Sequence, residues 1–232
     1  MNILCIETST SCCSAAICID GVAVASKENL AGANHASELP VFVEQLLAEA
    51  RANQWHLDAV ALSQGPGSYT GLRIGTSIAK GICYGMNIPL IPVDTLQILC
   101  NSVDNQYLTG DTNTMYCPMI DARRMEVYTA FFNDKLEKIS DTEALIVDEN
   151  SFMELKQNNH LYLFGDGADK LADLFENEDN ITVVEKFHCS AAYMAKLADE
   201  AFKNKQFVDV AYFEPFYLKN FVPGMPKVKG LD

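Results

Sequence analysis

The chain has 232 residues, of which 17 are lysine or arginine and 31 are aspartate or glutamate, giving a formal net charge of −14. Phosphate contacts come from basic side chains, so this charge argues against unaided nucleic-acid binding, although an acidic protein can join a complex whose other members hold the nucleic acid. Apolar residues make up 49% and charged residues 21% of the chain, which excludes a disordered or low-complexity architecture.

The N-terminal sequence and the cysteines indicate a cytoplasmic protein. The segment MNILCIETSTS carries neither a basic stretch nor a long apolar stretch, so we expect no signal peptide. No stretch approaches ~20 consecutive apolar residues, so we expect no membrane span. The eight cysteines form no CxxC pair and stand mostly in apolar runs, which predicts buried thiols in a reducing compartment.

The first hundred residues predict an α/β lobe. Apolar runs predict strands at 3–7, 14–20, 21–28, 58–64 and 89–93. Asp20-Gly21 is a hairpin signal between the second and third of these strands. Apolar residues at helical spacing predict a helix over 38–52 with Ser37 as its N-cap. A second helix is expected at about 70–85, after a glycine-rich loop, and a third from about residue 94.

The remaining sequence repeats the opening pattern. In both places an apolar strand ends at an acid, Glu7 in the first copy and Asp121 in the second, and a tight turn and an alternating strand follow. Further strands are predicted at 143–148 and 161–165, and helices near 150–157, 168–176 and 190–204. This pattern predicts an internally duplicated, two-lobed α/β fold.

The two lobes are predicted to span residues 1–100 and 101–214, and the helix at 190–204 is expected to pack back on the first lobe. Residues 215–232 form a proline- and glycine-punctuated tail that carries three lysines. The first lobe has a net charge of only −4, from eight acidic and four basic residues, so it is the less repelled surface for association.

The segment SQGPGSYTGLRIGTSIAKG (63–81) is the most informative part of the sequence. Gly65 and Gly67 lie between a strand and a helix, where backbone N–H groups and the helix N-terminus can face an anion. The segment matches neither the Gly-Lys-Ser/Thr phosphate loop nor a clean dinucleotide fingerprint. Phosphate binding and a tight turn in a close-packed interface therefore both remain open.

The helix after this loop has an unusually wide apolar or small face. At about 100° per residue, small and apolar residues cover more than half of its circumference, and several of them are glycines that lower helix propensity. Such a helix predicts close approach of another backbone, either from a partner or from the same chain. The candidate interface residues on this helix are Gly71, Leu72, Ile74, Gly75, Ile78, Ala79 and Ile82.

The turn after the first strand is the second candidate site. In duplicated α/β ATPases, the acid that ends this strand positions a metal–nucleotide and hydroxyls in the turn meet phosphate, which makes Glu7, Thr8 and Ser9 candidates. A hydroxyl-rich hairpin with no ligand explains the same residues. No two of the four histidines stand three or four residues apart and no GxSxG motif occurs, so we expect no metal site and no catalytic residue.

Four segments together closely resemble the bacterial TsaB family: ILCIETSTSCCSAAI, GPGSYTGLRIG with the IPLIPVDTL that follows it, IDARRMEVY (120–128) and EPFYLKNF (214–221). The likeness runs over nearly the whole chain, and residues of about 135–210 are its least diagnostic part. The resemblance implies the two-lobed fold of actin, hexokinase and Hsp70 (the ASKHA, or RNase H-like, class). TsaB proteins also carry an older glycoprotease-like label.

The resemblance implies a noncatalytic role in making N6-threonylcarbamoyladenosine (t6A) at position 37 of tRNAs that read ANN codons. A TsaC-type enzyme makes threonylcarbamoyl-adenylate, and a TsaD-type paralogue transfers the threonylcarbamoyl group. The TsaB-type subunit forms a heterodimer with TsaD through first-lobe helices, and a TsaE-type ATPase joins them. This adds Leu39, Val43 and Leu46 of the helix at 38–52 to the expected interface residues. The resemblance implies contact with tRNA only through the complex, no intrinsic cofactor, and ATP or ADP bound at the assembly.

Two further expectations follow from the residues. Glu7 stands where nucleotide-using relatives commonly have an aspartate, and its longer side chain would displace a metal-bridging carboxylate. A wide apolar arc exposed to water favours a homodimer when the partner is absent. The alternative function is an independent ASKHA-type nucleotide-dependent enzyme or a glycoprotease-like peptidase.

Overall fold

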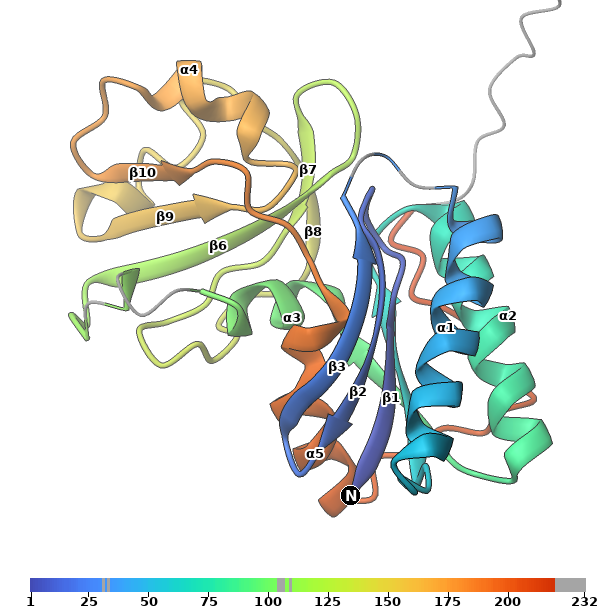
Figure 1. The fold of residues 1–232 in the computed structure, drawn as a ribbon. Coiled ribbons are helices and arrows are strands. Elements are labelled where there is room, and N and C mark those ends of the chain that lie inside the picture. The colour runs from blue at the N-terminus through green and yellow to red at the C-terminus, as the bar shows by residue number, and fades with distance from the viewer. Residues whose placement is uncertain (31, 33, 104–106, 109, 220–232) are drawn as a thin grey trace, which may run out of the picture.

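The computed structural model describes residues 1–30, 32, 34–103, 107–108 and 110–219. Two lobes, each built on one five-stranded sheet, make up this part of the chain (Figure 1). The expected tail therefore falls partly outside the described residues, since Lys227 and Lys229 belong to 220–232. Within the described residues no helix is long and apolar enough to cross a membrane.

The first lobe is a mixed sheet in the order β3-β2-β1-β4-β5. Its strands are β1 (Asn2–Glu7), β2 (Cys13–Ile19), β3 (Val22–Asn29), β4 (Ala59–Gly65) and β5 (Leu90–Asp94). The strand β1 is antiparallel to β2 and parallel to β4. Asp20 and Gly21 both have positive φ at the β2–β3 turn, as a two-residue hairpin requires.

Both faces of this sheet are buried, which explains the continuous apolar runs in its central strands. Leu4 and Ile6 of β1 face the helices α1 (His35–Ala52) and α2 (Tyr69–Met86). Ile3 and Cys5 face the opposite side, because successive side chains of a strand alternate. That opposite side is covered by α3 (Thr95–Asn101), the 3₁₀-helix η4 (Ala191–Met194) and α5 (Ala195–Lys203).

The second lobe repeats the topology of the first. Read from its other edge, its order β8-β7-β6-β9-β10 matches β3-β2-β1-β4-β5 strand for strand, with the same parallel and antiparallel pairs. Its strands are β6 (Thr114–Asp121), β7 (Glu126–Thr129), β8 (Glu143–Ile146), β9 (His160–Phe164) and β10 (Ile181–Val184). The first strands, β1 and β6, both end at an acid, Glu7 and Asp121. The duplication predicted from the sequence pattern is thus present in the fold.

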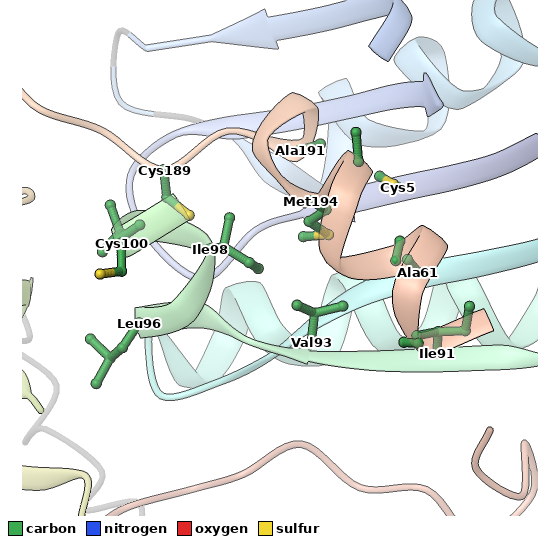
Figure 2. Close-up of a cluster of buried hydrophobic side chains, with 14 of the residues drawn as sticks. Cys5, Ala61, Ile91, Val93, Leu96, Ile98, Cys100, Cys189, Ala191 and Met194 are labelled. Atoms are coloured by element: carbon green, nitrogen blue, oxygen red, sulfur yellow. The ribbon is translucent and has the colours of Figure 1, made fainter. Parts of the chain in front are cut away.

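A shared core joins the lobes. One cluster of buried side chains combines Ile3 and Cys5 of the first sheet with Tyr116, Phe132 and Phe164 of the second lobe. In Figure 2, Met194 of η4 lies close to Cys5, and Ile98 and Cys100 of α3 lie on the side toward Cys189. The chain therefore returns to the first lobe after β10, and η4 and α5 pack on the face of the first sheet opposite α1 and α2 (Figure 1).

Several sequence-based boundaries need correction. The helix expected at 38–52 begins at His35, and Asn34 rather than Ser37 is its N-cap residue, because the Ser37 N–H already bonds to the Asn34 carbonyl. The helix expected at 150–157 is wrong. Asp148 accepts from the Asn150 N–H and the Ser151 hydroxyl accepts from the Asp148 N–H, so this stretch forms turns.

The structure differs in two more places of the second lobe. The only helical part near 150–157 is the 3₁₀-helix η2 (Leu155–Gln157), and the helix predicted at 168–176 is split into η3 (Asp169–Leu171) and the short α4 (Ala172–Phe175). The strand β10, four residues long and at the edge of the sheet, was not predicted from the sequence. Asp94, in contrast, is confirmed as the N-cap of α3, where its carboxylate accepts from Leu96 and Gln97.

Candidate functional site

A cleft of about 790 Å³ lies between the lobes. Most of its lining comes from four segments: the β1–β2 turn (Ser9, Thr10 and Ser11), the start of α2 (Gly67 to Gly71), the β6–β7 turn (Asp121 to Arg123) and the C-terminal residues Tyr217, Leu218 and Lys219. Many of the lining residues carry a hydroxyl group. The two hairpins that the sequence pattern singled out therefore face one another across the cleft.

The acid that ends β1 is not a wall of this cleft. Glu7 is fully buried, and its Oε1 accepts from both the N–H and the hydroxyl of Ser9 at 2.5 Å. Its Oε2 accepts from the Cys189 thiol at 3.3 Å. Burial raises the pKa of this carboxyl, and the hydrogen bonds from Ser9 oppose that rise. In this structure Glu7 therefore ties the β1–β2 turn to the segment before η4, and its expected contact with a nucleotide stays a prediction.

The other four candidate phosphate-contacting residues divide evenly. Thr8 is buried and donates its hydroxyl to the Gly71 carbonyl at 2.9 Å, and Gly65 is covered by the Phe216 backbone. These two residues hold β1, β4 and α2 together and do not face a ligand. Ser9 and Gly67, in contrast, line the cleft. A metal-bound nucleotide held by the acid of β1 does not fit this arrangement.

The second-lobe wall of the cleft carries two neighbouring carboxylates. Asp166 accepts from the Asp121 N–H at 3.1 Å, and Asp121 forms an ion pair with Lys170. Burial raises the pKa of Asp166 to about 6, and the nearby Asp121 charge adds to that rise. The sequence marked Asp121 as the counterpart of Glu7, but it is Asp121, not Glu7, that lies on the cleft wall.

The C-terminal segment crosses from one lobe to the other. The Phe216 N–H donates to the Gln64 carbonyl at 2.7 Å, and the Tyr217 and Tyr69 rings lie 4.8 Å apart. Lys219 then forms an ion pair with Glu126 of the second lobe. Sequence reasoning missed this wall of the cleft, and the EPFYLKNF segment was the available signal for it.

Most of the expected interface residues lie inside the first lobe. Gly75 and Gly71 lie against Thr8, where an added Cβ would overlap its side chain and its carbonyl, respectively. Seven of the expected interface residues are buried inside the first lobe: Leu39, Val43, Leu46, Gly71, Leu72, Gly75 and Ala79. The small residues of α2 permit close packing on the chain's own sheet, and in this structure these side chains are covered by the same chain. Their expected place in an interface stays a prediction.

Ile74, Ile78 and Ile82 are the expected interface residues that remain partly exposed. Ile74 and Ile78 line an apolar groove of about 430 Å³ between α2 and Ala36 and Pro40 of α1. We call this surface the α1–α2 groove. Large apolar side chains elsewhere on the two helices are also exposed: Val41, Tyr84 and Met86.

The structure shows no other obvious reactive centre in its described part. All eight cysteines are free thiols and all are buried. Burial raises the pKa of Cys83 to about 11 and that of Cys12 to about 12, which keeps these thiols protonated at neutral pH. Among the described residues, no group of three or more His, Cys, Asp or Glu side chains could hold a metal ion.

Comparison with known proteins gives consistent results. A family described as "TsaD: tRNA N6-adenosine threonylcarbamoyltransferase" matches residues 26–220. The "tRNA threonylcarbamoyladenosine biosynthesis protein TsaB" of Escherichia coli K12 is 31% identical over 96% of this chain and 96% of its own length. The protein of the same name from Haemophilus influenzae is 29% identical over 96% of this chain and 95% of its own length.

A solved structure described as YeaZ from Pseudomonas aeruginosa has the same fold. It superposes with a TM-score of 0.73 over 94% of this chain and 99% of that chain, at 24% sequence identity. The duplicated sheets and the cleft between them define a class of two-lobed, internally duplicated α/β proteins. Within that class, the chain belongs to the TsaB family of tRNA threonylcarbamoyladenosine biosynthesis proteins, which is related to TsaD.

Proposed function

We propose that this protein is the noncatalytic subunit that a TsaD-type transferase requires to place the threonylcarbamoyl group on adenosine 37 of ANN-decoding tRNAs. In this proposal it binds the transferase through the α1–α2 groove and acts as scaffold and activator. A TsaE-type ATPase joins the pair, a TsaC-type enzyme supplies the activated group, and tRNA is contacted only through the complex. The proposed site of action is the cytoplasm.

The proposal rests on two features found together in the first lobe: an apolar groove on its outer surface, and an acid at the end of β1 whose oxygens are already hydrogen bonded within the chain. Ile74 and Ile78 line an apolar groove on the two helices that cover the first sheet. An acidic side chain placed in this groove would lose its water in an interface, which is costly even though Arg73 also lines the groove. Glu7, which would have to hold a metal–nucleotide, is instead buried and hydrogen bonded to Ser9 and Cys189.

Two further parts of the proposal concern ligands and self-association. We propose that the subunit has no cofactor of its own and that ATP or ADP binds at the assembled complex. We also propose that the α1–α2 groove closes against a second copy when the transferase is absent, because exposed apolar surface favours association.

The test is light scattering after size exclusion, with the chain alone and mixed with the TsaD-type protein of the same source. We expect a 1:1 heterodimer to replace any homodimer. Ile78→Glu and Ala36→Glu, both in the groove, should abolish the heterodimer. Ala36 is exposed, so its variant keeps the test valid if Ile78→Glu fails to fold. Ile146→Glu is the matched control, since Ile146 lies in β8 of the second lobe and is 71% exposed.

No heterodimer with a folded transferase would overturn the proposal and favour the alternative, an independent nucleotide-dependent enzyme or a peptidase. Calorimetric titration with Mg-ATP and a peptidase assay on protein freed of contaminating protease then distinguish these two. A heterodimer that survives both groove variants would place the interface elsewhere and contradict the proposed binding surface.

A further inference from the structure

A second groove runs along the other side of α2, between this helix and the C-terminal segment. It has a volume of about 390 Å³ and is separate from the interlobe cleft. The helix contributes Tyr69, Arg73, Thr76, Ser77 and Lys80, and the C-terminal segment contributes Phe213, Glu214, Pro215 and Tyr217. We call it the α2–C-terminal groove. Its volume is within the range of small-molecule sites.

Two cations of this groove have no carboxylate partner. Arg73 donates to the Tyr69 hydroxyl at 2.6 Å and lies over that ring, 5.2 Å from its centroid. Lys80 donates to the Ala211 carbonyl at 3.1 Å. Within the described part of the chain, neither side chain forms a salt bridge, although Glu214 lines the same groove.

A buried hydroxyl between these cations also lacks a partner. Thr76 is only 7% exposed, and its Oγ1 is buried with no hydrogen-bond partner among the residues that the structure describes. Leaving a buried hydroxyl unsatisfied is costly. Because Oγ1 itself is closed to solvent, Thr76 must turn about its Cα–Cβ bond to present the hydroxyl to the groove. A ligand oxygen in the groove would then accept from Thr76 and relieve that cost, while Arg73 and Lys80 balance its charge.

We propose that the α2–C-terminal groove binds a phosphate-class oxyanion, with Arg73, Thr76 and Lys80 as its contacts. Arg73 presents a planar fork of N–H donors that suits phosphoryl oxygens, and Lys80 adds a compact positive charge. Glu214 opposes the anion and sets a limit on affinity. The oxyanion is either free phosphate or the phosphoryl group of a nucleotide. This groove shares Tyr69, Arg73 and Ser77 with the α1–α2 groove, but its test uses the chain alone and does not require the proposed transferase partner.

The test is isothermal titration of the full chain at low ionic strength, because salt weakens exposed charge interactions. Inorganic phosphate and ADP are the probes. We expect saturable binding that Arg73→Gln and Lys80→Gln each weaken about tenfold or more, as expected for the loss of a charge-assisted hydrogen bond. Lys196→Gln is the matched control, since it removes one exposed positive charge from α5, on another side of the lobe.

Two more variants test the groove directly. Thr76→Val keeps the side-chain shape and removes the unpartnered hydroxyl, so it should weaken binding several-fold without lowering the thermal midpoint. Glu214→Gln should tighten binding, because it removes the opposing charge. Tighter binding of ADP than of phosphate, with the same dependence on Arg73, identifies a nucleotide as the source, and equal binding identifies free phosphate.

Three results would overturn the proposal. One is the absence of saturable binding of either probe up to ~10 mM, an affinity of only a few kcal/mol. Another is binding that Arg73→Gln and Lys196→Gln weaken equally, which would reflect net charge alone. The third is binding that neither Arg73→Gln nor Lys80→Gln changes, which would place the oxyanion elsewhere.

Discussion

Replacing glycines of α2 by alanine should give opposite results at two positions of the same helix. At Gly71 a Cβ would overlap the backbone carbonyl of Thr8, with the carbonyl carbon 3.2 Å away, and a backbone atom cannot rotate aside. The change would also strain the hydrogen bond from the Thr8 hydroxyl to the Gly71 carbonyl. At Gly81 nothing lies within 4 Å of the added Cβ.

The expected magnitudes follow from these contacts. Alanine gains ~1 kcal/mol over glycine in a helix, so Gly81→Ala should stabilise the fold by about that amount. At Gly71 the same gain is outweighed by overpacking of up to ~3 kcal/mol and by a weakened hydrogen bond of ~1 kcal/mol. Gly71→Ala should therefore destabilise the fold by about 3 kcal/mol.

Urea unfolding followed by far-UV circular dichroism measures both free energies of unfolding. Comparing the two variants in one helix cancels the effect of helix propensity and isolates the packing against Thr8. If Gly71→Ala is as stable as Gly81→Ala, the small residues of α2 do not serve close packing on the chain's own sheet. The original interpretation of that face as a partner surface would then regain support.

Two further predictions concern titration and thiol reactivity. The pKa of Asp166 is raised to about 6 in the folded protein, so the folded state binds this proton more tightly than the unfolded state does. Relative to Asp166→Asn, the free energy of unfolding of the unmodified chain should therefore fall by about 1–2 kcal/mol as the pH rises from 4 to 6, and stay level at higher pH. This magnitude allows for solvent screening of the partly exposed carboxyl. Urea titrations at several pH values check this, and equal pH profiles for the two proteins would contradict it. All eight cysteines are buried, so an aromatic disulfide reagent at neutral pH should label none rapidly in the native protein and all eight in denaturant, and rapid native labelling would show that a thiol is accessible.

The architecture could be predicted well because the duplicated pattern depends on short stretches of sequence: apolar strands, tight turns and helix caps. Both lobes open with an apolar strand that ends at an acid, and Glu7 and Asp121 do end β1 and β6. The hairpin at Asp20 and the cap at Asp94 were also predictable, since each depends on residues within a few positions. The short β10 and the turns around Asp148 were not, because no long periodic stretch marks them.

The candidate site was harder to predict because it depends on contacts between distant segments. The periodicity of α2 showed a wide apolar face but could not tell which part of that face meets the chain's own sheet. Gly71 and Gly75 meet Thr8, more than 60 residues earlier in the chain, as the Thr8–Gly71 hydrogen bond shows. Glu7 looked like a ligand-binding acid, but its partner Cys189 lies 182 residues away. A contact between residues so far apart in the chain cannot be predicted from the sequence around either of them.

The central claim is that the chain acts through the α1–α2 groove and not through chemistry in its own cleft. The most direct measurement is threonylcarbamoylation of an ANN-decoding tRNA by reconstituted TsaC-, TsaD- and TsaE-type proteins with variants of this chain. Ala36→Glu in the groove should abolish t6A formation, whereas Asp166→Asn in the cleft should leave it unchanged. Loss of t6A with Asp166→Asn, together with normal activity of Ala36→Glu, would contradict the account.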